Sequence, residues 1–256
     1  MNTEKNEIAI VTGASSGIGA ATAKMLLSLG YEVYGFGRTF EAEWQSDSHS
    51  GKEDLGAAGC PDGQPAAKFH PIVCDLLDTN RVLQEIRAIE KAGRVTVLVN
   101  NAGAAYYGLH EELNPKKIQE MVRTNLELPM ILSQALLRTL KQNHGTIINI
   151  SSVTAVSSNP HGACYGAAKA GLSSFSRSLF EENRKYELRV ISILPDMTDT
   201  KLYRNADFTV GEEIESRLVP EDVASAIRFA LTAHPGMVVT ELMLRPQLHR
   251  IRRKPK

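Results

Sequence analysis

The strongest constraint on the fold is a regular alternation of short, almost purely apolar runs with longer stretches of helical periodicity. The runs "IAIV", "VTVLV" and "VISIL" are typical of strands buried on both faces of a parallel sheet. Between the runs, apolar residues recur at helical spacing, as Leu172, Phe175 and Leu179 do. This pattern predicts strands at Ile8–Thr12, Glu32–Gly37, His70–Cys74, Val95–Val99, Thr146–Ser151, Arg189–Leu194 and Met237–Met243.

The alternation predicts a single α/β domain with a doubly wound parallel sheet. Parallel strands need crossover connections, which are right-handed and usually contain a helix. The length of 256 residues suits one large domain spanning residues 1–256. Three stretches break the pattern: an expected loop insertion at 40–68, a substrate loop at 196–218 and a basic tail at 245–256. We interpret the tail, with its six Lys or Arg, as solvated; an acidic or nucleic-acid partner is the alternative.

Charge and cysteine content exclude several classes of function. The chain has 29 basic and 29 acidic residues, so nothing global attracts it to nucleic acid or to a membrane surface. Cys60, Cys74 and Cys164 fit free thiols in a reducing compartment. The sequence has neither an N-terminal signal-like run nor ~18 consecutive apolar residues. We expect a soluble cytoplasmic protein with no nucleic-acid or membrane partner and no metal.

A glycine-rich turn follows the first predicted strand and opens the first predicted helix. In "TGASSGIG", Gly13 permits a tight turn, Gly17 lets the backbone approach a diphosphate, and Gly19 allows close helix–strand contact. The helix N-terminus offers unpaired N–H groups and a positive dipole end to phosphates. Glycine-rich turns also arise for structural reasons, but the position after a buried strand favours a dinucleotide site that also includes Ser15, Ser16 and Ile18.

The end of the second predicted strand distinguishes NAD from NADP. An acidic residue there would bind the adenosine 2′-hydroxyl and repel a 2′-phosphate. The sequence instead has Gly37 followed by Arg38, whose guanidinium can pair with a phosphate through two hydrogen bonds. We therefore expect NADP(H) as the cofactor. The alternative is that Arg38 is an ordinary surface residue.

Three side chains form a candidate catalytic group. Tyr165 and Lys169, in "YGAAK", share one face of the helix predicted after the fifth strand, and Ser152 follows that strand. A ketone that accepts a hydride needs a proton, and a phenol of pKa ~10 is a poor participant at neutral pH. We expect the Lys169 ammonium to lower the pKa of Tyr165, so that the phenol acts as acid in reduction and base in oxidation. Ser152 would hold the substrate oxygen beside it.

From about Glu7 to Leu244 the chain resembles the classical short-chain dehydrogenase/reductase family. "TGASSGIG", "NNAG" at 100–103, "INISS" and "YGAAK" match that family's motifs in order and spacing. The resemblance implies a Rossmann-type seven-stranded parallel sheet, and a homodimer or homotetramer. It also implies a fourth catalytic residue, Asn125, on a helix that would hold a water in a proton relay to Lys169; Asn125 could otherwise be a helix-kink residue. It places the cofactor against Asp75, Leu76, Asn101, Ala102, Gly103, Tyr165, Lys169, Pro195, Thr198 and Thr200.

The chain departs from the family pattern after the sixth predicted strand. "LPDMTDT" has Asp196 where the family has glycine, although Thr200 is retained. Asp196 could reshape the loop, contact the substrate or point to solvent, and we favour solvent. Small residues on the helix of Tyr165 would allow close packing, either across a subunit interface or within the chain: Gly166, Ala167, Ala170, Gly171 and Ser174.

The substrate pocket is expected to be formed by Ala104–Tyr107, Val153–His161, Met197 and Leu202–Phe208. His161 could meet a polar substrate group or face solvent, and Cys164 is expected to be packed. Arg204 is the only arginine in these four segments, which favours a bulky neutral substrate over a small hydroxy acid. The expected apolar wall consists of Tyr106, Tyr107, Tyr203 and Phe208.

These observations predict an NADP(H)-dependent oxidoreductase that interconverts a ketone and a secondary alcohol. "GYEVYGFGRT" resembles hydroxysteroid-dehydrogenase-like members, whereas the ending "VTELMLRPQ" is similar to 3-hydroxy acid dehydrogenases and broad carbonyl reductases. It lacks the glycine pair typical of ketoacyl-carrier-protein reductases. A non-catalytic NADP-sensing or scaffold protein is the alternative of another class, and degraded motifs would favour it. A dehydratase or epimerase of the extended branch would need a longer chain.

Overall fold

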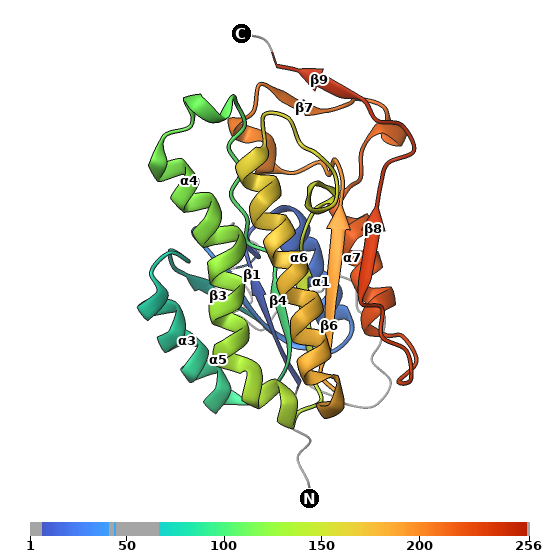
Figure 1. Cartoon of the computed structure of the whole chain (residues 1–256). Helices are drawn as coiled ribbons and strands as arrows, with labels where there is room; N and C mark the ends of the chain where they lie inside the picture. The colour runs from blue at the N-terminus through green and yellow to red at the C-terminus, as the bar shows by residue number, and fades with distance from the viewer. Residues whose placement is uncertain (1–6, 41–43, 45–66, 255–256) are drawn as a thin grey trace, which may run out of the picture.

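One parallel sheet organises the molecule. The computed structural model describes residues 7–40, 44 and 67–254 (Figure 1). Seven strands pair in parallel in the order β3-β2-β1-β4-β5-β6-β8, which confirms the doubly wound, Rossmann-type sheet predicted from the sequence. The strands are β1 (Glu7–Thr12), β2 (Glu32–Gly37), β3 (Phe69–Val73), β4 (Arg94–Asn100), β5 (Thr146–Ile150), β6 (Arg189–Pro195) and β8 (Glu241–Leu244).

Six of the predicted strands agree with the structure to within one residue at each end. The seventh does not. Its prediction began at Met237, but β8 begins at Glu241, because Met237 belongs to the turn after the last helix, where its N–H donates to the His234 carbonyl at 2.8 Å. An apolar run of this kind does not by itself show where a turn ends and a strand begins.

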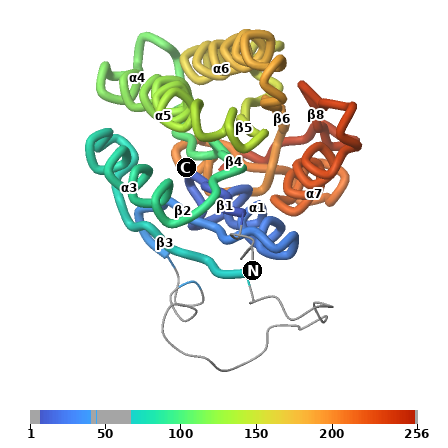
Figure 2. The backbone as a smooth tube through the Cα atoms, turned by 90° about the horizontal axis from the view of Figure 1, so that it is seen from below, coloured from blue at the N-terminus to red at the C-terminus, as the bar shows by residue number. Residues whose placement is uncertain are grey.

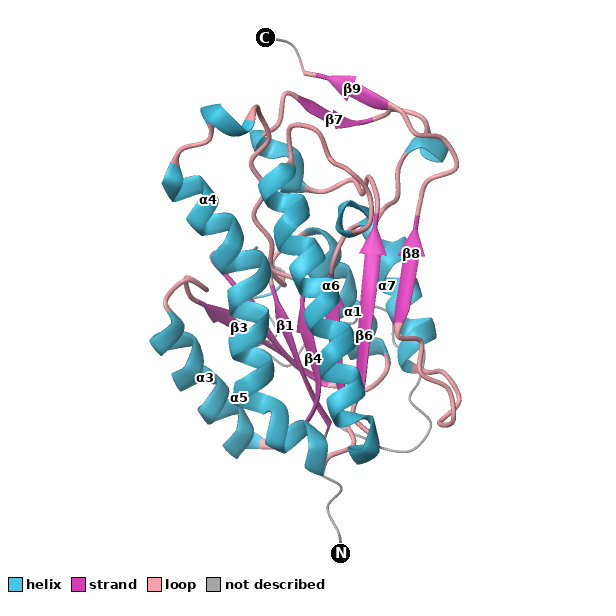
Figure 3. Cartoon of the chain, in the orientation of Figure 1, coloured by secondary structure: helices cyan, strands magenta, loops and turns pink. Residues whose placement is uncertain are grey.

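Helices cover both faces of the sheet (Figure 2). Figure 2 shows α1 and α7 on one face and α3, α5 and α6 on the other, with α4 leading into α5. Secondary structure is coloured in Figure 3. The helices are α1 (Gly17–Ser28), α3 (Thr79–Ala92), α4 (Pro115–Val122), α5 (Leu128–Gln142), α6 (Ala163–Asn183) and α7 (Pro220–Leu231), with a π-helical segment, η3 (Arg123–Glu127), between α4 and α5.

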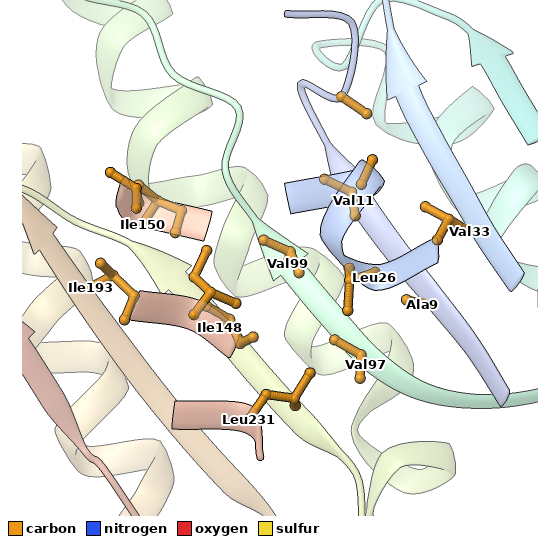
Figure 4. Close-up of a cluster of buried hydrophobic side chains, with 14 of the residues drawn as sticks. Ala9, Val11, Leu26, Val33, Val97, Val99, Ile148, Ile150, Ile193 and Leu231 are labelled. Carbon is orange, nitrogen blue, oxygen red and sulfur yellow. The ribbon is translucent and has the colours of Figure 1, made fainter. Parts of the chain in front are cut away.

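The two-residue period of the strands divides the core into two layers. On β1, Ala9 and Val11 pack towards α1 and α7, whereas Ile8 and Ile10 pack towards α3 and α5. Figure 4 shows part of the first layer, where Val97 and Val99 of β4 lie near Leu26 of α1. Because these strands are buried on both faces of the sheet, their sequences are unbroken apolar runs.

Side chains at the helix starts satisfy backbone donors that a helix leaves unpaired. Asp78 accepts a hydrogen bond from the Arg81 N–H before α3, and Asn114 accepts one from the Lys117 N–H before α4. At α7, Pro220 occupies the first turn and the Asp222 carboxylate accepts from the Val219 N–H. The carboxyl ends of the strands therefore meet well-defined helix starts.

Most side chains of residues 245–254 are exposed, as predicted for the basic tail, but the tail also pairs with another part of the molecule. β9 (Ile251–Arg253) pairs antiparallel with β7 (Phe208–Val210), and the two strands lie above the carboxyl ends of the sheet strands in Figure 1. Sequence periodicity could not show this pairing, because its partners are about 40 residues apart and only three residues long each. Short helical turns occupy much of the remaining connections: η2 (His110–Glu112), η4 (Val153–Ala155), η5 (Arg184–Tyr186), η6 (Lys201–Asn205) and η7 (Ile214–Ser216).

Most of the predicted 40–68 insertion, including Cys60, lies outside the described residues. Trp44 is described and buried, with its ring centroid 4.0 Å from that of Phe69. In the part of the chain that the structure describes, no helix is both long and apolar enough to span a membrane.

Candidate active site

A cleft of about 1240 Å³ lies where the carboxyl ends of the strands meet the helix starts. Its lining includes every predicted cofactor residue except Gly19, and also Ser152, Tyr165 and Lys169. Open α/β sheets bind ligands at this edge, where the strand order reverses. Here the reversal falls between β1 and β4, next to the glycine-rich turn.

The glycine-rich turn requires glycine at each of its three positions. Gly13 and Gly17 have φ of +68° and +55°, the left-handed region that disfavours other residues. A Cβ on Gly19 would lie 2.1 Å from the Gly13 carbonyl oxygen, so Gly19 allows the turn to close on itself. Ser16 is the N-cap residue of α1, but its side chain makes no capping hydrogen bond. The first backbone N–H groups of α1 therefore lie at the cleft and donate no hydrogen bond to the Ser16 side chain.

Thr12, which the sequence analysis missed, fixes the loop after β4 against this turn. Its hydroxyl accepts hydrogen bonds from the N–H groups of Asn101 and Ala102 at 2.9 and 3.0 Å. The Asn101 amide donates to the carbonyls of Thr12 and Gly13 at 2.9 and 3.2 Å. A threonine at the end of a buried strand is an ordinary strand residue, so only the spatial pairing of β1 with β4 reveals its role.

The adenosine end of the expected cofactor site is exposed. Arg38 follows β2 directly and lies at the cleft with an exposed side chain. Asp75 follows β3, and its carboxylate accepts a hydrogen bond from the Leu77 N–H at 3.0 Å. These two residues come from neighbouring strands, because β2 pairs with β3. Their positions match those expected from the sequence.

Ser152, Tyr165 and Lys169 meet in the middle of the cleft. Ser152 follows β5, whereas Tyr165 and Lys169 lie one turn apart on α6. The Ser152 hydroxyl lies close enough to the Tyr165 phenol to lower its pKa, although burial has the larger, opposite effect. The Lys169 ammonium nitrogen lies 5.7 Å from the Tyr165 ring centroid and donates to the Ile150 carbonyl at 2.7 Å. All three side chains are buried.

Burial, rather than mutual attraction, sets the acidity of these groups in the protein itself. It raises the pKa of Tyr165 to about 12, against a smaller opposing effect of the Ser152 hydroxyl. It lowers the pKa of Lys169 to about 7, so the ammonium form is only partly populated at neutral pH. The expectation that Lys169 lowers the pKa of Tyr165 is therefore not met by the chain's own groups, because desolvation of the phenolate outweighs a distant and partly neutral amine.

Asn125 lies behind the cleft wall rather than in it. It is fully buried in η3, and its amide donates to the carbonyls of Ala104 and Met121 at 2.7 and 2.8 Å. Its side-chain oxygen accepts from the Ala104 N–H at 3.3 Å. Pro129 has no N–H with which to bond the Asn125 carbonyl in an α-helical register. The side chain thus braces the loop after β4, and the helix is irregular at this point.

Three of the four predicted wall residues form an aromatic cluster. The Tyr107 ring centroid is 5.0 Å from that of Phe208 and 6.2 Å from that of Tyr203. Tyr106 is not part of this wall: its hydroxyl donates to Glu120 at 2.8 Å, and Lys117 lies over its ring. Adjacent residues on an extended segment point to opposite sides, which explains why only one of the two tyrosines reaches the cleft.

The structure also places the other residues that the sequence singled out, namely Asp196, His161, Cys164 and the small residues of α6. Asp196 lies at the cleft, and its carboxylate accepts from the Met197 N–H at 2.8 Å, so it shapes the loop rather than pointing freely to solvent. His161 lines the cleft with φ of +63°. Burial raises the pKa of the Cys164 thiol. Gly171 packs within the chain, since a Cβ there would lie 3.0 Å from Leu126, whereas Ala167 is exposed.

The sequence analysis missed a set of cleft residues from the tail. The one available signal is the cluster of basic residues in "RIRRK" opposite in charge to the acidic pair Glu212 and Glu213. The tail residues at the cleft are Arg245, His249, Ile251 and Arg253.

Comparison with known proteins places this site in a family. An oxidoreductase of Staphylococcus epidermidis, described as uncharacterized, is 30% identical over 243 residues, which cover 94% of this chain and 98% of that protein. The 3-oxoacyl-(acyl-carrier-protein) reductase of Escherichia coli is 36% identical over 205 residues, 80% of this chain and 78% of that protein. The crystal structure of a metagenomic short-chain oxidoreductase in complex with NADP has a TM-score of 0.75 at 29% identity and covers 94% of this chain and 98% of its own.

The family model that matches this chain is that of the short-chain dehydrogenases, and it matches residues 7–209. That range contains the glycine-rich turn, the buried Ser152–Tyr165–Lys169 group and the sheet that positions them. The chain therefore belongs to the short-chain dehydrogenase family.

Proposed function

We propose that this protein is an NADP(H)-dependent oxidoreductase that interconverts a ketone and a secondary alcohol. The observation that carries the proposal is that Ser152, Tyr165 and Lys169 are buried together in a cleft that continues to the glycine-rich turn. One end of the cleft suits a dinucleotide, and the other has an apolar, aromatic wall that suits a bulky portion of a substrate.

The residues of the cleft fit NADP(H). Gly13 and Gly17 hold an open turn at the start of α1, where backbone N–H groups would face a diphosphate. Arg38 would pair with the 2′-phosphate, and Asp75 with Leu76 would lie beside the adenine. Pro195, Thr198 and Thr200 line the cleft near Tyr165 and would lie against the nicotinamide. NADPH, when bound, supplies the hydride for reduction, and NADP⁺ accepts it in oxidation.

In the proposed reduction, residues of the chain itself hold and transfer the proton. The Ser152 hydroxyl would donate a hydrogen bond to the substrate carbonyl oxygen and hold it beside the Tyr165 phenol. As the carbonyl carbon gains a hydride, its oxygen becomes an alkoxide, and Tyr165 would donate its proton to that oxygen. The product is a secondary alcohol, and a proton from solvent restores the phenol. Lys169, buried beneath both groups, would stabilise the transient phenolate.

The acidity of Tyr165 favours reduction at neutral pH. With its pKa raised to about 12, the phenol carries its proton throughout the physiological range and is ready to donate it. Oxidation needs the phenolate, which becomes more populated as pH rises. The oxidative rate is therefore expected to increase with pH, whereas the reductive rate is expected to change little below neutrality.

The relay role of Asn125 remains a proposal. The irregular helix leaves the Asn125 carbonyl without the bond that Pro129 cannot donate, and such a carbonyl could hold a water. A chain of this water, Lys169 and Tyr165 would connect the phenol to solvent. The exposed small residues Ala167 and Ser174 on α6 are compatible with a homodimer or homotetramer, which we also propose.

Replacing the proposed acid tests the function. We expect Tyr165→Phe to lower the rate of NADPH oxidation with a ketone substrate by about 10²–10⁴-fold, because one aligned proton donor is lost. The matched control is Tyr186→Phe, the same change at an exposed tyrosine in η5, the turn that follows α6. NADPH binding, measured by fluorescence, should survive in both variants. Unchanged turnover in Tyr165→Phe would refute the assignment of the acid.

A further inference from the structure

The tail of the chain closes over the substrate end of the cleft and is anchored at several points. The Leu248 N–H donates to the Glu215 carbonyl at 2.8 Å, and the Lys254 N–H donates to the Asp207 carbonyl at 2.7 Å. The Lys254 ammonium also donates to the Tyr203 carbonyl at 2.6 Å. Figure 3 shows the resulting β7–β9 ribbon above the strand ends. Residues 245–254 are thus a wall of the site.

Strand alternation sorts the basic side chains of this ribbon onto two faces. Arg250 and Arg252 pair with Glu213 and Glu212 at 2.5 and 2.6 Å, on the face away from the cleft. Arg253, with the opposite orientation, lines the cleft together with Ile251. Two of the three arginines are therefore neutralised by carboxylates, and the third is presented to the substrate.

Three guanidinium groups at this end of the cleft, those of Arg204, Arg245 and Arg253, have no carboxylate counterpart in the described part of the chain. No carboxylate oxygen there lies within 4.0 Å of a nitrogen of any of the three. Five acidic residues also line the cleft, of which Asp75 lies at the cofactor end. Glu120 already accepts from the Tyr106 hydroxyl and Asp196 from the Met197 N–H; Glu112 and Asp207 are exposed. His249 lies on the same wall as Arg245 and Arg253.

An apolar path connects Tyr165 to this basic wall. The Tyr165 and Tyr107 ring centroids are 6.3 Å apart, and Tyr107 is 5.0 Å from Phe208. Phe208 is directly opposite Arg253 in the β7–β9 register. A substrate whose carbonyl lies at Tyr165 would run along these rings and end at the guanidinium. Guanidinium groups stay charged at all ordinary pH and bind carboxylate or phosphate through two hydrogen bonds.

We infer that the substrate carries an anionic group, a carboxylate or a phosphate, at the end away from its carbonyl, and that Arg253 with Arg245 and His249 binds this group. The inference rests on the proposed function and names its substrate class. It replaces the expectation of a neutral substrate, which depended on finding only Arg204 in the pocket segments. The structure brings the missing arginines from the tail, about 50 residues further along the chain.

Matched pairs of carbonyl compounds test the inference. NADPH oxidation would be followed with 6-oxoheptanoate against its methyl ester, and with 5-oxohexyl phosphate against 6-hydroxyhexan-2-one, which separates a carboxylate from a phosphate on spacers of equal methylene count. We expect kcat/KM at least about tenfold higher for the charged member of one pair. Arg253→Met should lower kcat/KM for that member by about tenfold or more, mainly through KM, and leave the uncharged member unchanged. Arg252→Met, on the opposite face of β9, breaks one exposed ion pair and should change either value by less than about twofold.

A binding measurement separates failure of the inference from failure of the proposed function. Hexanoate and hexanamide would be titrated calorimetrically into NADPH-saturated protein, without turnover. Binding of hexanoate alone, lost in Arg253→Met and kept in Arg252→Met, would support the basic wall even if no ketone of the panel were reduced. Three results would overturn the inference while leaving any observed ketone reduction in place. They are equal binding of hexanoate and hexanamide, no binding of either, and, in Arg253→Met, an equal loss of kcat/KM for the charged and the uncharged ketone of a pair.

Discussion

The two halves of the cleft are built in different ways. The cofactor half is formed by the ends of β1 to β4 and the start of α1, all parts of the sheet and its helices. The substrate half is formed by residues 196–218 and by the tail, which lie outside the seven-stranded sheet and pair mainly with each other. A change in the first half should act through the rigid sheet, whereas a change in the second can act on the substrate alone. Three predictions test this contrast.

The largest effect is expected at Lys169, where the two halves meet. Lys169→Met should lower turnover by about 10²–10⁴-fold, because the variant loses the amine that stabilises the transient phenolate in the proposed mechanism. It should also stabilise the protein. Burial lowers the Lys169 pKa from 10.5 to about 7, a penalty of up to about 4–5 kcal/mol at 1.36 kcal/mol per unit. Loss of the bond to Ile150 offsets about 1–2 kcal/mol.

The stability gain should depend on pH in a defined direction. Between pH 7 and 10.5 the unfolded chain binds more protons at Lys169 than the folded chain does, so wild-type stability rises with pH through this window. The variant lacks that rise, and its advantage of about 2–4 kcal/mol below pH 7 should disappear above pH 10.5. Urea unfolding at several pH values measures this difference in the free energy of unfolding between the variant and the wild type. Arg177→Met, at an exposed position of the same helix, is the control, and an equal gain there would contradict the burial argument.

The next effect is confined to the cofactor half. Arg38→Ala should raise the KM for NADPH by roughly 10–100-fold, because a charge-assisted, two-point contact with the 2′-phosphate is lost. The KM for NADH, which has no such phosphate, should stay within about twofold, and so should the KM for the carbonyl substrate. Steady-state kinetics with both cofactors provide an internal control. A parallel loss with NADH would show that Arg38 supports the fold of this edge instead.

The contrast between the halves also explains what the sequence could predict. Gly13, Tyr165 and Lys169 belong to local motifs whose spacing alone places them on a turn or on one helix face, and the structure brings them to one cleft. The sequence also predicts six strands to within one residue at each end, because burial on both faces of the sheet produces an unbroken apolar run. Such features depend on neighbours in the sequence.

Features that depend on distant partners were missed or misread. Thr12 acts by accepting hydrogen bonds from backbone groups 89 and 90 residues away, and nothing in its own sequence context distinguishes it from an ordinary strand residue. The exposure of the tail follows from its charge, but its pairing with β7 does not, because each strand of this pair is only three residues long. The substrate prediction then followed from an incomplete list of cleft residues. Long-range pairing, not local preference, decides this half of the site.

The smallest effect concerns the ion pairs that hold the ribbon. Glu212→Gln with Glu213→Gln removes the counterparts of Arg252 and Arg250, which are exposed pairs worth about 0.2–1 kcal/mol each. The ribbon should open more often, so we expect trypsin to cleave within residues 250–254 about two- to fivefold faster at low salt. KM for an anionic substrate should rise by a similar factor, and KM for NADPH should not change.

Salt provides the control for this last prediction. The faster trypsin cleavage and the higher KM of the double variant should both disappear near 1 M salt. At that salt concentration the Debye length falls to about 3 Å, so the exposed ion pairs are screened in the wild type as well. Glu241→Gln, which removes the partner of Arg177 far from the cleft, should leave both readouts unchanged. If the double variant instead weakened NADPH binding, the ribbon would be coupled to the sheet, and the two halves of the cleft could not be treated as separate structural units.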